Sequence, residues 1–150
     1  MRKSDMSNNH LTGPLPVLSH AGSLDESSVS NSDWRGHLVT SGSADYSPLR
    51  VLKLDSNHFE GDIQLTFSMM PNIEVLNLTS NLFGRGGKPI PTQLEHTTKL
   101  NYLGLGHNEY DGSIPEEFQV LTQLEEMDLS GNPRVNGTLP EFLGTSLVQL

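Results

Sequence analysis

The stretch Leu100-Asn-Tyr-Leu-Gly-Leu-Gly-His-Asn-Glu-Tyr-Asp-Gly-Ser-Ile-Pro115 carries the pattern that decides the fold. The stretch Leu49-Arg-Val-Leu-Lys-Leu-Asp-Ser-Asn-His-Phe-Glu-Gly-Asp-Ile63 repeats it, with leucine, asparagine, an aromatic residue and glycine at the same offsets. Both fit L-x-x-L-x-L-x-x-N-x-(F/L/Y)-x-G-x-(I/L). Further copies, of which the first two are degenerate and the last is partial, begin at Met1, Leu24, Ile73, Leu124 and Leu147. A pattern that recurs this often predicts a repeat architecture.

The spacing of the copies indicates the class of repeat. Their starts lie 23 to 27 residues apart, which falls in the range of about 20–29 residues for leucine-rich repeats. We therefore expect one leucine-rich repeat domain over residues 1–150. Within it, residues 17–48 are degenerate, because Ser27 and Ser32 stand where leucine and asparagine belong. We expect a loose repeat there, with a mobile stretch around residues 40–47.

The first half of each repeat predicts a strand and a turn. The fourth and sixth positions alternate with polar ones, which is the period of a half-buried strand. Strands of successive repeats should stack in parallel, with these side chains pointing inward: Leu52, Leu54, Leu76, Leu78, Leu103, Leu105, Met127 and Leu129. The asparagine at the ninth position lies where the backbone turns away from water, and its amide offers both a donor and an acceptor. We expect a ladder of Asn9, Asn57, Asn81, Asn108 and Asn132, in which Ser32 is a partial replacement.

The second half of each repeat should cover the outer side. The core behind the turn is expected to hold Leu11, Trp34, Phe59, Phe83, Tyr110 and Val135. Glycines that follow allow a tight bend. Prolines favour an extended outer segment over a helix, at Pro16, Pro91, Pro115 and Pro140. Phe67, Leu94, Phe118 and Leu143 should close the outer side. The fold class is an α/β repeat solenoid with a parallel β-sheet on one side and mostly irregular or 3-10 structure on the other.

The composition excludes several classes of function. A hydrophobic fraction of 34% indicates a thin core, and 18 Asp+Glu against 9 Lys+Arg give a net charge of −9. Nucleic acid and anionic membrane surfaces are therefore disfavoured as partners, because both need a basic footprint. No run approaches the roughly 18 apolar residues of a membrane span, so we expect no membrane insertion by this segment. The absence of cysteine excludes disulfides, thiolate zinc sites and cysteine nucleophiles.

The sequence also carries no pattern typical of an enzyme. The six histidines lack paired metal-ligand spacing, and no serine has a recognisable base. The Gly-rich stretch 83–91 lacks the spacing of a phosphate-binding loop. We interpret it as a surface bulge that could make a side contact through Arg85 and Lys88. We expect no catalytic residue, no metal and no cofactor.

The candidate ligand site lies on the concave side, where residues between and just after the inward leucines face solvent. The candidates are Lys53, Asp55, Asn77, Tyr102, His107, Glu126 and Asp128. Tyr102 beside His107 is the best anchor, since an aromatic ring with a polar tip offers area and a hydrogen bond. Gly104 and Gly106 should leave a shallow hollow next to it. The acidic C-terminal part suggests a basic ligand group; the alternative is that these are ordinary solvated strand residues.

Two N-glycosylation acceptor triplets occur, Asn77-Leu-Thr79 and Asn136-Gly-Thr138. Asn136 is expected on an outer turn and is the better acceptor. A glycan on Asn77 would obstruct the concave side.

The tails of three repeats, Leu11-Thr-Gly-Pro-Leu-Pro16, Tyr110-Asp-Gly-Ser-Ile-Pro115 and Val135-Asn-Gly-Thr-Leu-Pro140, resemble those of plant-type extracellular leucine-rich repeats. Members of that family include ectodomains of receptor-like kinases, receptor-like proteins and soluble inhibitors of cell-wall hydrolases. The resemblance implies a curved right-handed solenoid whose concave parallel sheet recognises a peptide, steroid or protein. The chain departs from the family in having no cysteine-bearing caps and no signal peptide.

Three hypotheses follow for function. The first is a non-enzymatic protein- or peptide-recognition module, a fragment of a cell-surface receptor-like protein. The second is a soluble inhibitor of an extracellular hydrolase, and the third is an intracellular scaffold, so that a cytoplasmic location stays open. Because neither end carries a polar capping repeat, we expect a piece of a longer repeat protein; the alternative is a short protein that dimerises end to end.

Overall fold

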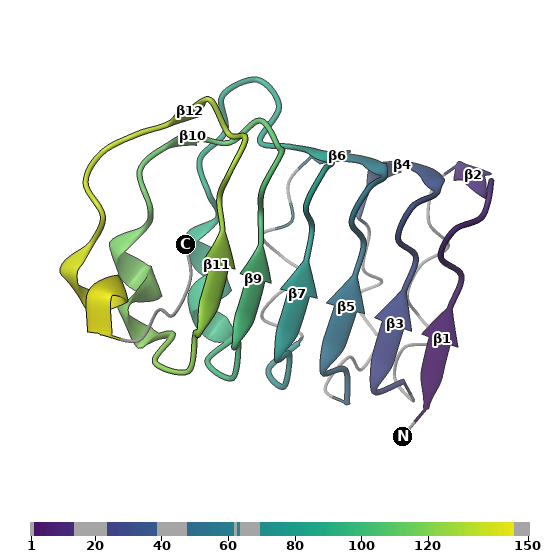
Figure 1. The fold of residues 1–150 in the computed structure, drawn as a ribbon, viewed down its shortest axis with the longest axis horizontal. Helices are drawn as coiled ribbons and strands as arrows, with labels where there is room; N and C mark the ends of the chain where they lie inside the picture. Colours follow the sequence, from purple (N-terminus) through teal and green to yellow (C-terminus); the bar gives the residue numbers. More distant parts are fainter. Residues whose placement is uncertain (1, 14–23, 39–47, 62, 64–69, 146–150) are drawn as a thin grey trace.

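The computed structural model describes residues 2–13, 24–38, 48–61, 63 and 70–145, and shows a parallel β-solenoid. Its main sheet has six parallel strands that stand side by side in sequence order (Figure 1). They are β1 (Lys3–Asp5), β3 (Glu26–Ser28), β5 (Val51–Lys53), β7 (Val75–Asn77), β9 (Tyr102–Gly104) and β11 (Glu126–Asp128). Each begins two residues after one of the predicted repeat starts. The predicted fold class is confirmed.

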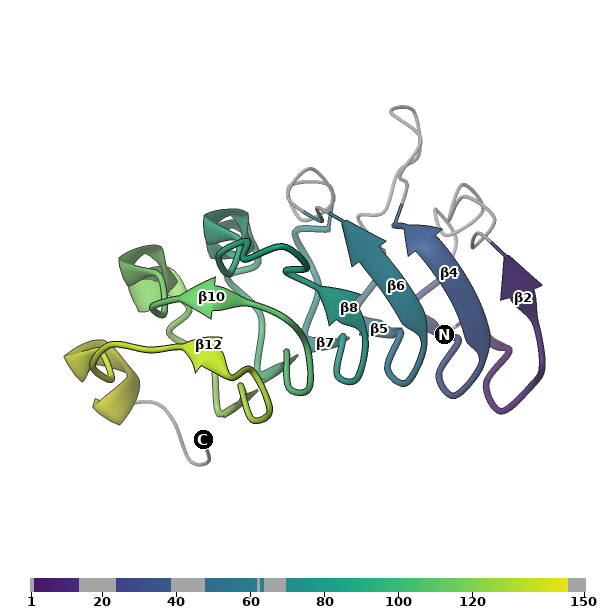
Figure 2. The same ribbon diagram turned by 90° about the horizontal axis from the view of Figure 1, so that it is seen from above.

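A second set of short strands runs along one flank of the solenoid (Figure 2). Four of them form a parallel sheet: β2 (Thr12–Gly13), β4 (Asp33–His37), β6 (His58–Gly61) and β8 (Leu82–Phe83). The other two, β10 (Asp111–Gly112) and β12 (Arg134–Val135), pair with each other. The sequence pattern indicated only a turn here. The glycines that bend the chain at these strands have φ between 81° and 97°, at Gly13, Gly36, Gly61, Gly112 and Gly137.

In the described residues the outer side carries the 3-10 helices η2 (Thr92–His96), η3 (Glu116–Val120) and η4 (Glu141–Thr145). The main sheet lies on the inner side of the curve and these helices on the outer side (Figure 2). Each helix starts directly after a proline. Pro91 and Pro115 are themselves extended, with ψ of 121° and 136°. The expected extended segment is therefore correct only as far as the proline, because the chain then tightens into a 3-10 turn.

The core follows the leucine pattern in the regular repeats, whereas Leu11, which was expected in the core, is exposed. All six inward leucines of β5, β7 and β9 are fully buried and Met127 is nearly so, whereas Leu129 and Val135 are only partly buried. The rings of Phe59 and Phe83 stack with centroids 6.5 Å apart. On the outer side Leu94, Phe118 and Leu143 are buried as expected. The expectations for Pro16, Phe67, residues 40–47 and the repeat start at Leu147 lie outside the described residues.

The asparagine ladder joins neighbouring repeats. The side-chain oxygens of Asn57, Asn81, Asn108 and Asn132 accept hydrogen bonds from backbone amides of the preceding repeat, those of Trp34, Phe59, Phe83 and Tyr110. Asn9 is exposed, and within the described residues it donates only to carbonyls of its own turn. The hydroxyl of Ser32 is buried and has no hydrogen-bond partner in the described part of the chain. The expected partial replacement by Ser32 is thus wrong, since a hydroxyl is too short to reach either neighbour.

Candidate functional site

The register of the main sheet arranges the predicted site residues in rows on the concave face. Lys53, Asn77 and Asp128 share one row with Gly104. Tyr102 and Glu126 are partners in the row beside it, which begins with Lys3 and Glu26 and continues through Val51 and Val75. Because the strands are parallel and in register, residues about 24 positions apart become direct neighbours.

Tyr102 is the centre of an acidic cluster, which we define as Asp55, Tyr102, Glu126 and Asp128. The Tyr102 side chain is half-buried. Burial raises the pKa of its hydroxyl above 10.0, and the negative charges of Glu126, Asp128 and Asp55 raise it further. Three of the predicted site residues, Asp55, Glu126 and Asp128, are therefore close enough to act on the Tyr102 hydroxyl.

Hydrogen bonds fix two of the carboxylates in this cluster. Asp55 Oδ1 accepts from Ser30 Oγ at 2.7 Å and from Asn77 Nδ2 at 3.0 Å. Asp128 Oδ1 accepts from the backbone nitrogen and the hydroxyl of Ser130, at 2.9 and 2.6 Å. In both residues Oδ2 accepts no hydrogen bond from the described residues. Each carboxylate is thus held in place through its Oδ1.

The hollow expected at Gly104 and Gly106 is filled, so that prediction is wrong. Both glycines are buried. A β-carbon on Gly104 would lie 2.5 Å from Asn77 Oδ1, and one on Gly106 would lie 2.5 Å from Asp128 Oδ2. Side chains from the neighbouring strands occupy the space that these two residues leave.

Tyr102 and His107 contact different glycines. The Tyr102 ring leans over Gly104 of its own strand, with Cε1 3.1 Å from where a β-carbon would be. The imidazole of His107 is exposed and lies against Gly131, in the turn of the next repeat. His107 itself sits in the turn that follows β9, with φ of 51°.

Lys53 belongs to a different part of the concave face. It lines a shallow cavity of about 250 Å³ together with Lys3, Asp5 and Glu26. Lys3 and Glu26 form an ion pair at 2.6 Å. Hydrogen bonds from Ser7 lower the pKa of Asp5, with a smaller effect of the Lys53 charge. The sequence reasoning missed this mixed-charge cavity because the first two repeats are degenerate, although residues 3, 5 and 26 occupy the same repeat positions as the candidates further along.

The two glycosylation candidates have different surroundings. Asn77 is half-buried on the main sheet and bonded to Asp55, and its Oδ1 accepts from the Thr79 nitrogen at 3.2 Å. Asn136 is exposed after β12 and donates to the Arg134 carbonyl at 3.0 Å.

The described ranges show neither a metal-binding cluster nor a membrane-spanning helix. They contain no group of three or more histidine or carboxylate side chains placed to hold a metal ion. No helix within them has both the length and the apolar character that a bilayer crossing requires.

The chain is similar to plant receptor proteins. A family model described as Leucine Rich Repeat matches residues 123–146. The chain is 33% identical to Receptor-like protein 18 of Arabidopsis thaliana over 138 residues, which are 92% of this chain and 16% of that protein. It spans about a tenth to a sixth of the length of the curated relatives it matches.

Solved structures agree with this similarity. The ectodomain of the plant membrane receptor kinase GASSHO1/SCHENGEN3 from Arabidopsis thaliana, in complex with CASPARIAN STRIP INTEGRITY FACTOR 2, superposes with a TM-score of 0.84 at 28% identity. The match covers 100% of this chain and 18% of that one. The ectodomain of the Arabidopsis receptor kinase HAESA, in complex with a peptide hormone ligand, gives a TM-score of 0.71 at 27% identity, over 89% of this chain and 21% of that one.

Proposed function

The chain belongs to the plant-type leucine-rich repeat family, and on this premise we propose that it is a non-enzymatic recognition module of a cell-surface receptor-like protein. It binds a protein or peptide ligand on its concave face. The ectodomains of GASSHO1/SCHENGEN3 and HAESA, each solved with a bound partner, support a ligand of this kind.

The acidic cluster around Tyr102 is the observation that carries this proposal. A half-buried aromatic ring offers contact area to an extended segment. The carboxylates of Asp55, Glu126 and Asp128 lie close enough to the ring to raise the pKa of its hydroxyl, and hydrogen bonds hold those of Asp55 and Asp128 in place. A lysine or arginine side chain complements this arrangement, because it lays its aliphatic stem along the ring and directs its charge to the carboxylates.

A peptide selection tests the proposal. A phage-displayed library of random peptides is selected on the immobilised 150-residue chain, and the enriched peptides are sequenced. We expect enrichment of lysine and arginine. The same peptides should bind at least about tenfold more weakly to the Tyr102→Ala chain and to the Glu126→Gln/Asp128→Asn chain, since truncating a central contact costs more than about 1.4 kcal/mol.

The control is Glu117→Gln, which neutralises an exposed carboxylate on the outer helix η3 and should leave binding unchanged. Peptides that bind the Glu126→Gln/Asp128→Asn chain as tightly as the unaltered one would overturn the proposal.

A further inference from the structure

The repeat that starts at Ile73 has a three-residue excess over its 24-residue neighbours, and the structure shows where it goes. After β8 the chain turns at Gly84, whose carbonyl accepts from the backbone nitrogens of Gly87 and Lys88, at 3.1 and 2.9 Å. It rejoins the flank at Pro89, which forms a bridge with Asp111. The flank sheet is therefore interrupted, since β8 pairs with β6 on one side while β10 pairs with β12 on the other.

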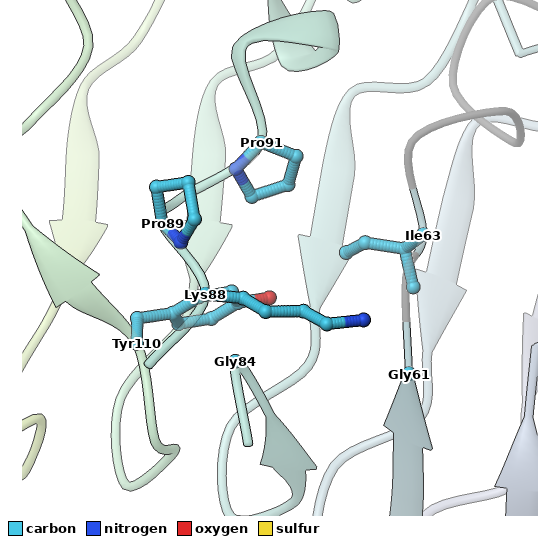
Figure 3. A pocket seen from close by; sticks show the side chains of 7 residues that line it. All are labelled: Gly61, Ile63, Gly84, Lys88, Pro89, Pro91 and Tyr110. Atoms are coloured by element: carbon cyan, nitrogen blue, oxygen red, sulfur yellow. The ribbon is translucent and has the colours of Figure 1, made fainter. Parts of the chain in front are cut away.

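A cavity of about 240 Å³ opens at this interruption (Figure 3). Ile63, Pro91 and Tyr110 form its floor and are buried. The Lys88 side chain is exposed and lies across the cavity, with its ammonium directed toward Ile63 (Figure 3). This volume is below the roughly 300–1,000 Å³ of small-molecule sites, so the cavity suits a single side chain.

Among the described residues Lys88 has no ionic partner, in contrast to the other cations on this flank. Arg85 pairs with Glu60 at 3.3 Å, Arg35 with Asp33 at 3.3 Å, and Arg134 with Asp111 at 3.5 Å. Lys88 has no ion pair or hydrogen bond from its side chain to any part of the chain that is described. An ammonium above the side chains of Ile63 and Pro91 and the ring of Tyr110 complements a ligand that has an apolar group and an adjacent negative charge.

We propose that this flank cavity is a second docking site, separate from the concave face. Its occupant is an exposed aliphatic side chain of a partner protein that is flanked in sequence by aspartate or glutamate. The aliphatic group covers Ile63, Pro91 and Tyr110, and the carboxylate pairs with Lys88. A basic flanking residue is disfavoured by repulsion from the same ammonium.

Two capped dipeptides test the site, acetyl-Asp-Leu-amide and acetyl-Asn-Leu-amide, which have the same shape and differ in charge. Each is titrated at low salt into the isotope-labelled chain while the backbone amide signals of Gly61, Ile63 and Gly84 are followed by NMR. We expect these signals to shift in a saturable way, with the aspartate peptide binding at least about threefold more tightly, as for a partly exposed ion pair. The preference should shrink as salt is added.

Lys88→Gln should abolish the preference for the aspartate peptide, whereas Lys99→Gln should keep it. Lys99 is an exposed lysine remote from the cavity, and its Nζ donates to Asn72 Oδ1. Equal binding of both peptides, or a preference that survives in Lys88→Gln, would overturn the proposal, as would the absence of shifts at millimolar peptide. Shifts confined to Tyr102 and its neighbours would place the peptide on the concave face and also contradict it. Tyr102→Ala should leave the flank binding intact, which keeps this test independent of the proposed function.

Discussion

The backbone nitrogen of Phe59 donates a 2.9 Å hydrogen bond to the side-chain oxygen of Asn81, 22 residues further along the chain. The side-chain nitrogen Nδ2 of Asn81 donates to the carbonyl of Leu54 in the preceding repeat and to the carbonyl of Leu78 in its own repeat. One buried side chain therefore satisfies backbone groups in two repeats at once. This explains why the position tolerates so little variation among the regular copies.

Replacing Asn81 with alanine should reduce the free energy of unfolding by about 3 kcal/mol, because it leaves a buried donor and buried acceptors without partners. Urea denaturation measures the loss. Asn9→Ala is the matched control, since Asn9 is exposed and bonds only within its own turn; it should cost less than about 1 kcal/mol. Equal losses in the two variants would contradict the role of the ladder between repeats.

Gly84→Ala should be more damaging than Gly86→Ala, although both glycines have positive φ, of 77° and 84°. An added β-carbon at Gly84 would lie 2.6 Å from the backbone of Tyr110, whereas one at Gly86 meets nothing within 4 Å. Gly86→Ala should cost about 1–2 kcal/mol of conformational strain, and Gly84→Ala clearly more. A comparison of the two urea midpoints checks this order, and the reverse order would show that the loop can move away from Tyr110.

The hydroxyl of Tyr102 should ionise above pH 10, because burial and the three carboxylates raise its pKa. Because this pKa is raised in the folded state, the contribution of the protonated hydroxyl to stability is fully present below the pKa of the unfolded chain. The contribution is lost as the pH rises through the pKa of the folded chain. The phenolate absorbance of the chain, minus that of Tyr102→Phe, gives the titration of this residue alone. Glu126→Gln should move the midpoint down toward 10.0. If the titration midpoint of Tyr102 is unchanged in Glu126→Gln, the Glu126 charge does not act on Tyr102 and Glu126 does not belong to the acidic cluster.

Expression through the secretory pathway of plant cells should place a glycan on Asn136 and leave Asn77 unmodified. Asn136 is exposed, whereas the Asn77 amide is half-buried and bonded to Asp55. Mass spectrometry of glycopeptides reads out both positions. Thr138→Ala, which removes the acceptor triplet and keeps the asparagine, should abolish the signal, and Thr79→Ala should not change it. Full occupancy of Asn77 would contradict this and would move the ligand site away from β7.

The leucine period was sufficient to predict the main sheet, because a strand buried on one face needs that alternation in its own sequence. In the degenerate repeat, where Ser27 replaces the leucine, the loose repeat that was expected contains the main-sheet strand β3. The flank sheet was not predictable in this way, since strands such as Leu82–Phe83 are too short to show a period. The filled spaces at Gly104 and Gly106 depend on side chains from neighbouring strands, and hence on lateral register. Local pattern contains no information about that register.

Val75 pairs in register with Tyr102, and Val51 pairs in register with Val75. The partners are 27 positions apart in the first pair and 24 positions apart in the second. The added length is absorbed entirely at the flank, on the far side of the turn. Insertions there can accumulate during evolution without shifting a single contact of the ligand-facing rows. A gene of this kind can thus diversify the two proposed docking surfaces independently, lengthening loops on one while exchanging single codons on the other.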